Sequence, residues 1–349
     1  MKWQKLFIQR FMDKTKKLII LFFVVFFIIC IGASNGSSNI SIKDTFYILL
    51  NNVFNFPIDH IDQKTISIVE NIRLPRVILA FLVGGALSVS GAVVQSVLKN
   101  ELVSPYTLGI SAGSSFGASL VLVFGINLSF LGNFTFPIVG FLSGLFTIYI
   151  VLIFSSKVDK TFSNNTIILS GMVFSLFING ILTVLMSMFR ESLETITLWQ
   201  MGSFSMKGMS YVYILLPFIV VSIVGILFYV REMDILTFGE EQAKIVGVDT
   251  TKVKKRLFIF STILAGSAVS VSGIIGFVDL ISPHISRKIF GSKHILVIPV
   301  SFLIGGSLMV VADLIGRTII SPAELPVGAI TAIIGAPFFA YVYFSKKKG

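Results

Sequence analysis

The chain has 349 residues, of which 54% are hydrophobic and only 13% are charged, and its mean hydropathy is +0.92. A soluble domain carries about 25% charged residues, so this composition excludes an ordinary soluble protein and indicates that lipid surrounds most of the chain. The net charge of +11 does not point to nucleic-acid binding, because the basic residues gather at the ends of apolar runs, where an anionic leaflet attracts them. No polar stretch is long enough for a separate domain of roughly 50 residues, so we expect one transmembrane domain over residues 1–349.

Nine apolar runs approach the roughly 20 residues that cross a bilayer as a helix. They lie at residues 18–33, 77–98, 106–125, 133–154, 165–188, 211–230, 257–272, 295–315 and 326–344. The first run could instead belong to a cleaved signal peptide, since a basic region followed by about 14 apolar residues matches one. Cys30, within that run, is expected to be a lone buried thiol.

Both ends of the chain are basic, in the tail of residues 1–17 and again at residues 346–348. By the positive-inside rule both termini are then cytoplasmic, which nine crossings do not allow. We therefore predict a short tenth span at residues 273–285, GIIGFVDLISPHI, broken by Pro283 and followed by basic residues. The expected fold class is an all-α integral membrane protein with about ten transmembrane helices and both termini cytoplasmic.

A glycine ladder follows the second span. Gly109, Gly113 and Gly117 are spaced four apart, which puts them on one face of a helix. A neighbouring backbone can approach such a face closely. The spacing predicts helix packing of the kind found in membrane bundles.

The fifth span, residues 165–188, carries polar side chains among apolar ones, at Ser170, Ser175 and Asn179. Ser175 and Asn179 are one helical turn apart, so a polar stripe could face a pore. It could equally make hydrogen bonds between helices.

The largest cytoplasmic loop is expected at residues 231–256. Its GEEQAKIVGVD core predicts a short surface helix that ends at Gly247, where a positive φ angle is tolerated. Such a helix is either a contact for another protein or a solvated connection between two spans, and the spacing alone does not decide between them.

Several kinds of chemistry have no motif here. The sequence has no phosphate-binding loop, and His60, His284 and His294 are far apart, without metal-ligand spacing. We therefore expect a transporter or channel subunit, not an enzyme. A proton-driven secondary transporter is the alternative class, but only Asp279 and Asp313 are candidate membrane carboxylates, and no internal repeat is apparent.

Eight strings of residues, in the same order, resemble the FecCD-type permeases of ATP-driven importers for ferric siderophores, haem and cobalamin. They are RLPR (73–76), SGAVVQ (90–95), SPYTLGISAG (104–113), WQMGSF (199–204), GVDTTKVKKR (247–256), SPHISR (282–287), ADLIGR (312–317) and AELPVGAITAIIGAPFF (323–339). The resemblance covers essentially the whole chain.

The resemblance implies a multi-pass permease of the bacterial cytoplasmic membrane that works in a complex. Its partners would be a second permease subunit, identical or paralogous, two cytoplasmic ATPases that use ATP and Mg²⁺, and an extracytoplasmic substrate-binding protein. This chain would bind no cofactor and no metal. A ferric siderophore is the favoured substrate, haem is second and cobalamin is third.

The resemblance also implies docking of the binding protein on outward-facing arginines, at the positions of Arg73, Arg76 and Arg317. The rigid fork of arginine suits a carboxylate partner. Two other interpretations remain: each arginine could anchor a helix end at the headgroups, and Arg317 could pair with Asp313 four residues earlier.

At the cytoplasmic side the resemblance makes residues 231–256 the segment that couples to the ATPase, with Glu240, Glu241, Ala243 and Gly247 as its contact core. It places gates in two turns and the pore along the fifth span and the short helix after it. The gate candidates, for which ordinary turn chemistry is an equal explanation, are Asn100, Leu102, Asn164 and Asn165.

Asp279 departs from the family pattern, in which a small residue is usual. A carboxylate inside a membrane is unfavourable unless it is paired or hydrated. We expect a structural ion pair with His284 or Arg287, and we keep a role as a substrate ligand as the alternative.

Overall fold

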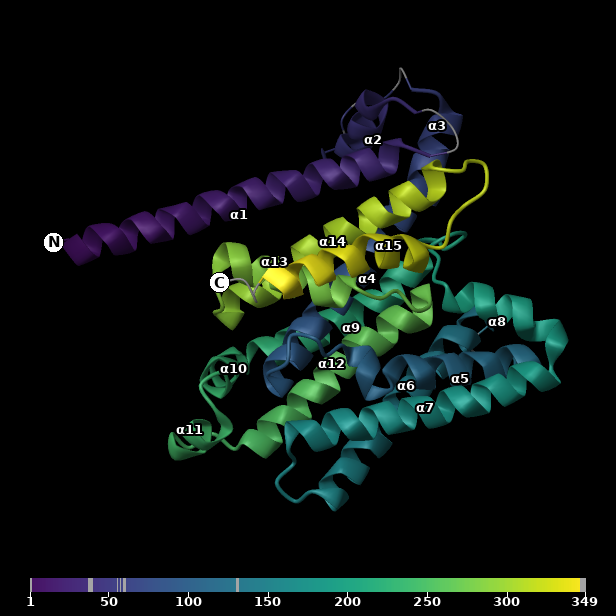
Figure 1. Cartoon of the computed structure of the whole chain (residues 1–349). Helices are drawn as coiled ribbons and strands as arrows, with labels where there is room; N and C mark the ends of the chain where they lie inside the picture. Colours follow the sequence, from purple (N-terminus) through teal and green to yellow (C-terminus); the bar gives the residue numbers. More distant parts are fainter. Residues whose placement is uncertain are drawn as a thin grey trace.

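The computed structural model describes residues 2–36, 40–54, 56, 58, 61–129 and 132–345, and within them the secondary structure is entirely helical (Figure 1). His60 and residues 346–348, used in the predictions above, lie outside the described residues. The helices are α1 (Lys2–Ser34), α2 (Ile42–Phe54), α3 (Gln63–Ile68), η1 (Val69–Arg73), α4 (Leu74–Leu98), η2 (Pro105–Leu108), α5 (Ile110–Phe124), η3 (Gly132–Phe134), α6 (Thr135–Val158), α7 (Asn164–Met188), η4 (Arg190–Ser192), α8 (Leu193–Gln200), α9 (Met209–Leu227), α10 (Val230–Leu236), α11 (Glu240–Ile245), α12 (Thr250–Ser272), α13 (Val278–Phe290), α14 (His294–Thr318) and α15 (Val327–Ser345).

Six of these helices are long and apolar enough to cross a membrane: Lys14–Ser34, Gln63–Leu98, α6, α7, α9 and α14. Helices Ile110–Phe124 and Val327–Tyr341 are apolar but shorter. The two remaining predicted spans correspond to α12, whose first turns carry several basic residues, and to the 13-residue α13. The all-helical fold is confirmed, whereas ten crossings and cytoplasmic termini stay predictions.

The bundle is organised around α4. In the helix Gln63–Leu98, 83% of the most apolar window is buried, compared with 22% in α7. A side chain at Gly84 would collide with the carbonyl of Gly305 on α14, and one at Gly305 would collide with Ser88 on α4. Glycine is required at this crossing because the two backbones touch. α4 therefore lies at the centre of the bundle, and other helices pack against it.

The glycine ladder packs against α6, but only two of its members lie in the helix. Side chains at Gly113 and Gly117 would collide with Thr147 and Ser143 of α6. Gly109 is instead the residue before α5, with φ +91°, and separates η2 from α5. Its glycine is needed for that left-handed conformation. Gly109 therefore lies outside the predicted helix, although a side chain there would also meet Thr147 of α6.

The break in the short span at residues 273–285 is also displaced. α13 continues through Pro283, and the chain is irregular before it, with φ +81° at Gly273 and +68° at Phe277. Proline lacks the N–H that would bond to the carbonyl four residues earlier. Gln95 Nε2 of α4 donates to that carbonyl, on Asp279, at 3.2 Å, and this contact compensates for the proline.

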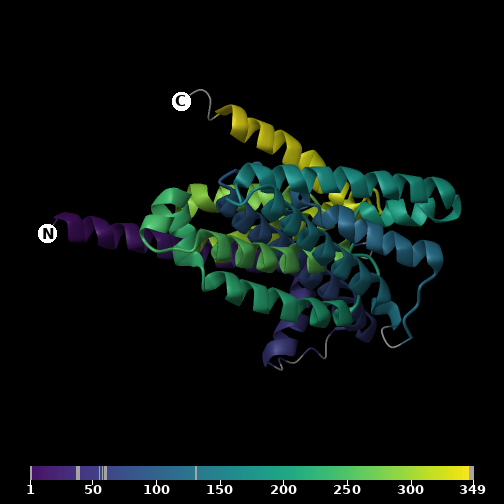
Figure 2. The ribbon, with the colours of Figure 1, turned by 90° about the horizontal axis from the view of Figure 1, so that it is seen from below.

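The two ends of the bundle differ in what they present. Figures 1 and 2 show that α1 begins, and α15 ends, on the side of the molecule where α10 and α11 lie. The α14–α15 connection and α8 lie toward the opposite side. Two surfaces far apart in space therefore carry the two groups of predicted site residues.

Candidate functional site

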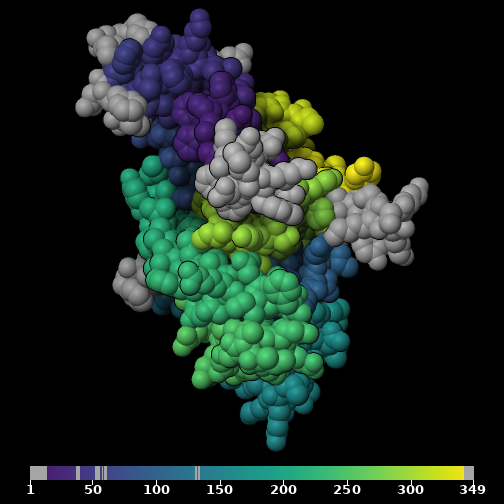
Figure 3. Space-filling view, turned by 90° about the vertical axis from the view of Figure 1, so that its left-hand side faces the viewer, coloured from purple at the N-terminus to yellow at the C-terminus, as the bar shows by residue number. Residues whose placement is uncertain are grey.

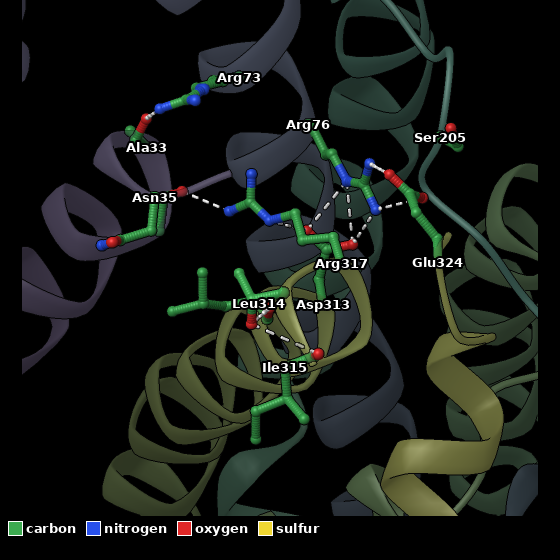
Figure 4. Close-up of polar contacts among 12 residues, drawn as sticks. Ala33, Asn35, Arg73, Arg76, Ser205, Asp313, Leu314, Ile315, Arg317 and Glu324 are labelled. Atoms are coloured by element: carbon green, nitrogen blue, oxygen red, sulfur yellow. Dashed lines mark hydrogen bonds and ion pairs between the residues drawn. The ribbon is translucent and has the colours of Figure 1, made fainter. Parts of the chain in front are cut away.

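The three predicted docking arginines come together at one end of the bundle (Figure 4). Arg73 ends η1 and Arg76 lies in the first turn of α4, while Arg317 is in the last turn of α14. With Glu324, from the α14–α15 connection, they line a cavity of about 390 Å³. We call Arg73, Arg76, Arg317, Asp313 and Glu324 the arginine cluster.

Arg76 is held by two carboxylates. Its Nη2 lies 2.8 Å from Asp313 Oδ1, and its Nη1 lies 2.8 Å from Glu324 Oε1. The side chain of Asp313 is 1% exposed and that of Glu324 is 37% exposed, so the first pair is internal and the second reaches solvent. The hydrogen bond and charge of Arg76 lower the pKa of Glu324 below its usual value, which keeps this carboxylate ionised at neutral pH.

Arg73 and Arg317 are bonded to the end of α1. Arg73 Nη1 donates to the carbonyl oxygens of Ala33 and Ser34, and Arg317 Nη2 donates to that of Gly32. The last carbonyls of a helix have no partner within it, and a cation there also interacts favourably with the helix dipole. The two arginines therefore fix α1 to the bundle, which explains why they are only 4% and 6% exposed.

The anchoring of separate helix ends at the headgroups does not describe this arrangement. Asp313 is shared, since its Oδ2 also lies 3.5 Å from Arg317 Nε, so the local pair considered for Arg317 exists but is the longer contact. Among the described residues, three guanidinium groups and the Glu324 carboxylate line the cavity. Such a cavity can accept a further carboxylate.

At the other end, residues 231–256 form α10, α11 and the start of α12. This part of the chain, in green, covers much of the face seen in Figure 3. The predicted short helix is present as α11, and Gly247 follows it with φ +87°. A side chain at Gly247 would meet nothing within 4 Å, so glycine is needed there for its backbone conformation and not for space.

The predicted contact core of this segment divides into an outer and an inner part. Glu241 and Gly247 are exposed, but Ala243 has no exposed surface and packs into the core. Glu240 turns partly inward, with Oε1 2.5 Å from Lys254 Nζ. Ala243 thus positions α11 and does not reach a partner, which corrects the prediction for that residue.

Large apolar side chains stand out from the same segment. Phe238 is 78% exposed, Ile245 84% and Val246 65%. Ile245 ends α11, and Phe238 and Val246 lie on either side of this helix, whose Glu241, Gln242 and Lys244 are exposed. An exposed apolar group with a polar rim is typical of a protein–protein contact, and the sequence pattern did not single these residues out.

The second predicted gate turn contacts the end of α4, directly before the first gate turn. Asn164 Nδ2 donates to the carbonyl of Leu98 at 3.2 Å, and Asn164 Oδ1 accepts from Lys254 Nζ at 2.8 Å. Asn100 Oδ1 accepts from the backbone N–H of Leu102 at 2.9 Å, which is ordinary turn chemistry. Leu102 is 48% exposed, and Asn165 is also exposed.

The two serines of the predicted polar stripe on α7 show no hydrogen bond to another helix in the described part of the chain. Ser170 and Ser175 each donate to a carbonyl of their own helix, at 2.7 and 2.8 Å. Asn179 is exposed, on a helix that also exposes Leu176, Phe177 and Met188. α7 therefore presents a free, largely apolar face with a few polar groups, and the interhelical explanation finds no contact at the two serines.

The ion pair expected for Asp279 is wrong. Arg287 Nη1 donates to Gln95 Oε1 at 2.7 Å, and His284 Nδ1 lies 3.7 Å from Glu101. Asp279 Oδ2 accepts from Ser104 Oγ, and Oδ1 has no hydrogen-bond partner in the described part of the chain. Arg287 is thus bonded to α4 and not to Asp279. The described residues also contain no group of His, Cys, Asp and Glu suited to a metal ion.

Sequence reasoning did not identify Glu324 and Lys254 as site residues. Glu324 lies in the string AELPVG but is 248 residues from Arg76. Lys254 is one of several basic residues at the start of α12, and only the fold makes it 1% exposed while its neighbour Lys252 stays 75% exposed. A helical wheel of this amphipathic start is the only signal that could have separated them.

Comparison with known proteins agrees with this architecture. The model of the FecCD transport family matches residues 21–345, and the chain therefore belongs to that family. It is a permease of an ABC importer. Its helices and family place it among multi-pass membrane proteins.

Several relatives are similar over most of their length. The uncharacterised ABC transporter permease protein YvrB of Bacillus subtilis is 41% identical over 92% of this chain and 91% of that protein. The molybdate import system permease protein MolB of Haemophilus influenzae is 33% identical over 94% and 95%. A structure reported as an inward-facing metal-chelate type ABC transporter has a TM-score of 0.83 at 28% identity and covers 95% of this chain and 99% of that one. Other relatives are permeases named for import of Fe³⁺-hydroxamate (Bacillus subtilis), transport of hemin (Yersinia pestis) and import of cobalamin (Halobacterium salinarum), at 34%, 34% and 36% identity.

Proposed function

We propose that this chain is the membrane-spanning permease subunit of an importer that moves a ferric siderophore across the bacterial cytoplasmic membrane. A substrate-binding protein delivers the ligand at the arginine cluster, and a separate ATPase that uses ATP and Mg²⁺ acts on residues 231–256. The observation that carries the proposal is the convergence of Arg73, Arg76 and Arg317 on one cavity, at the end of the bundle opposite α11.

The arginine cluster suits an acidic partner. Glu324 is the more exposed of the two carboxylates that hold Arg76. An exposed ion pair such as Arg76–Glu324 contributes little stability. A carboxylate from the binding protein can replace Glu324 beside Arg76, while Asp313 keeps the guanidinium in position. Arg73 and Arg317 hold α1 in place beneath the docking site.

The opposite end suits the ATPase. The exposed Phe238, Ile245 and Val246 supply apolar area, and Glu241 supplies charge at the rim. If residues 240–247 are replaced by a Gly/Ser linker, the ATPase is expected to be lost on co-purification. A linker variant that still assembles with the ATPase would contradict the coupling role.

The free face of α7 supports a second permease subunit. In a monomer, this face of α7 would lie against lipid, and the amide of Asn179 would be unpaired in hydrocarbon, which is unfavourable. A pore between two subunits, lined by α7 and α8, would hydrate Asn179 and the half-buried Ser175. The same geometry serves an identical or a paralogous partner.

The substrate is tested by growth of a strain that lacks this permease. Under iron limitation, the strain receives ferric hydroxamates, ferric catecholates or haem as its sole iron source, and parallel cultures depend on cobalamin or molybdate. Loss of growth on one ferric siderophore class, restored by the gene, is expected. Loss of growth on haem, cobalamin or molybdate alone would identify that compound as the substrate and contradict the siderophore assignment.

A further inference from the structure

Two chains of polar contacts, each with a buried side chain at its middle, join the coupling segment, residues 231–256, to the last turn of α4. The first begins at Asp234 on α10. Its Oδ1 lies 2.6 Å from Nδ1 and 3.0 Å from the backbone N–H of His294, the first residue of α14. His294 Nε2 lies 2.6 Å from Ser96 Oγ on α4. The His294 side chain is 2% exposed, so this contact is inside the protein.

The direction of these hydrogen bonds is set by their ends. An ionised carboxylate only accepts, so His294 Nδ1 carries a hydrogen and donates it to Asp234. With a neutral ring, Nε2 accepts from the Ser96 hydroxyl, and Ser96 Oγ accepts in turn from Arg287 Nη2 at 3.3 Å. Each group has a partner on both sides, and hydrogen bonds in such a series strengthen one another.

The second chain begins at Glu240 on α11. Glu240 Oε1 lies 2.5 Å from Lys254 Nζ, which also donates to Asn164 Oδ1 at 2.8 Å. Asn164 Nδ2 then donates to the carbonyl of Leu98. Lys254 is 1% exposed, and a buried ammonium group strongly favours keeping its partners, because their loss would leave its charge uncompensated.

Both chains therefore end within three residues of each other, at Ser96 and Leu98, directly before the turn at residues 99–102. The helices at the other ends, α10 and α11, have seven and six residues. Helices this short are not stable by themselves, so their contacts with the bundle set their position. Hydrogen bonds are directional, and two of them at separate points resist rotation as well as displacement.

We propose that Lys254 and His294 are positioning residues that make the coupling segment and the turn at residues 99–102 move as one body. The inference rests on the proposed function, in which an ATPase displaces this segment. The inference names the residues that transmit this movement to the turn at residues 99–102. They are Asp234, His294 and Ser96 in one chain, and Glu240, Lys254 and Asn164 in the other.

The test measures distances between spin labels in the complex of permease and ATPase in lipid nanodiscs, with and without ATP, Mg²⁺ and vanadate. Cys30 is replaced by Ala. One pair of labels joins Leu102 to Lys244, and a reference pair joins Leu102 to Asn127, all three positions being exposed. For the unaltered chain, we expect the Leu102–Lys244 distance to stay constant and the Leu102–Asn127 distance to change when nucleotide binds.

Two double variants cut both chains at different points. Asp234→Ala with Lys254→Met cuts them near the coupling segment, and Ser96→Ala with Asn164→Ala cuts them at the gate turn. In both, the Leu102–Lys244 distance is expected to change with nucleotide and the Leu102–Asn127 response to fall at least two-fold. Having two variants guards against a folding defect in either one. If both respond like the unaltered chain, the inference is overturned while the proposed function stands.

The controls separate position from charge. Lys252→Met removes a lysine of the same segment that pairs with Asp249 and is 75% exposed, and its distances should match those of the unaltered chain. Lys254→Arg should restore the behaviour that Lys254→Met loses. If the unaltered chain does not bind the ATPase, or neither distance responds to nucleotide, the proposed function itself is contradicted, and the inference with it.

Discussion

Arg76 and Asp313 are 237 positions apart in the sequence and form an ion pair in which Asp313 is 1% exposed. The pair joins the first turn of α4 to the end of α14, the two helices whose backbones touch at Gly84 and Gly305. The pair thereby fixes Arg76 at the cavity that Arg73 and Arg317 also line, and these two arginines bond to the end of α1. The docking surface and the attachment of α1 share one carboxylate.

Asp313→Asn is expected to destabilise the protein, because Arg76 would lose its buried partner and Arg317 its nearby negative charge. Breaking a buried ion pair by removing one partner costs about 3–5 kcal/mol. The measurement is the unfolding midpoint of the purified permease in detergent. Glu191→Gln, at an exposed position, is the matched control, and an equal midpoint for both variants would contradict a structural role for Asp313.

Glu324→Gln should act on docking and hardly on stability. The Glu324 side chain is 37% exposed, so its pair with Arg76 contributes less than about 1 kcal/mol. The neutral glutamine no longer competes with a carboxylate of the binding protein for Arg76. The affinity for the binding protein is therefore expected to rise several-fold. Titration of the binding protein onto permease in nanodiscs gives the dissociation constant, and weaker binding would show that Glu324 itself faces the partner.

Arg317→Gln separates the docking charge from the attachment of α1. Glutamine keeps a donor for the Gly32 carbonyl but loses the charge, whereas Arg317→Glu also loses the donor. We expect Arg317→Gln to express like the unaltered chain and to bind the binding protein about tenfold more weakly, which corresponds to roughly 1.4 kcal/mol. Arg317→Glu should additionally lower the yield of folded protein. Full binding by the glutamine variant would limit Arg317 to a structural role.

Ile245→Asp tests the apolar contact on the coupling segment. Ile245 is 84% exposed, so aspartate leaves the fold unaffected but puts a charge into the proposed ATPase interface. Retention of the ATPase during purification of the tagged permease should fall at least tenfold. Ile245→Met is the control and should retain it. Unchanged retention with aspartate would place the interface elsewhere.

Asp279→Asn is expected to leave uptake and stability unchanged or to improve stability slightly. Its Oδ1 has no partner in the described part of the chain, and Ser104 still has an amide oxygen to which it can donate. Ser104→Ala, which leaves the carboxyl group without that donor, should cost about 1–3 kcal/mol. Both are measured by unfolding in detergent and by uptake of the assigned siderophore. Loss of uptake in the asparagine variant, with unchanged stability, would make Asp279 a substrate ligand.

The sequence predicted the helical segments well, because apolar runs and basic ends are local features of the chain. It failed where the backbone departs from the pattern. Gly109 fits a ladder by spacing, but the chain needs its positive φ angle to leave η2. Pro283 looks like a helix break, yet Gln95 from another helix satisfies the carbonyl that proline frees, and no local signal announces that partner.

The site residues divide in the same way. The motifs predicted Arg73, Arg76 and Arg317 as outward-facing residues, but only the fold brings them to one cavity. Their partners were not predictable, because Glu324 and the carbonyl groups of α1 approach them only through packing of distant helices. The spacing of four residues did predict that Asp313 could pair with Arg317. Asp313 nevertheless forms its closer contact with Arg76.

By itself, the sequence determined that this protein belongs in a membrane, that it is built of helices, and that it belongs with the FecCD permeases. Composition, run length and ordered motifs carry that information without any knowledge of three-dimensional contacts. Only the tertiary structure decided which ionisable groups are buried and what they bond: Lys254 and Lys252 are two residues apart, yet one side chain is enclosed between α11 and the α6–α7 turn and the other is in solvent. The physical reason is that burial depends on which distant helix packs over a residue, and a charged side chain keeps its buried position only where those helices supply its partners.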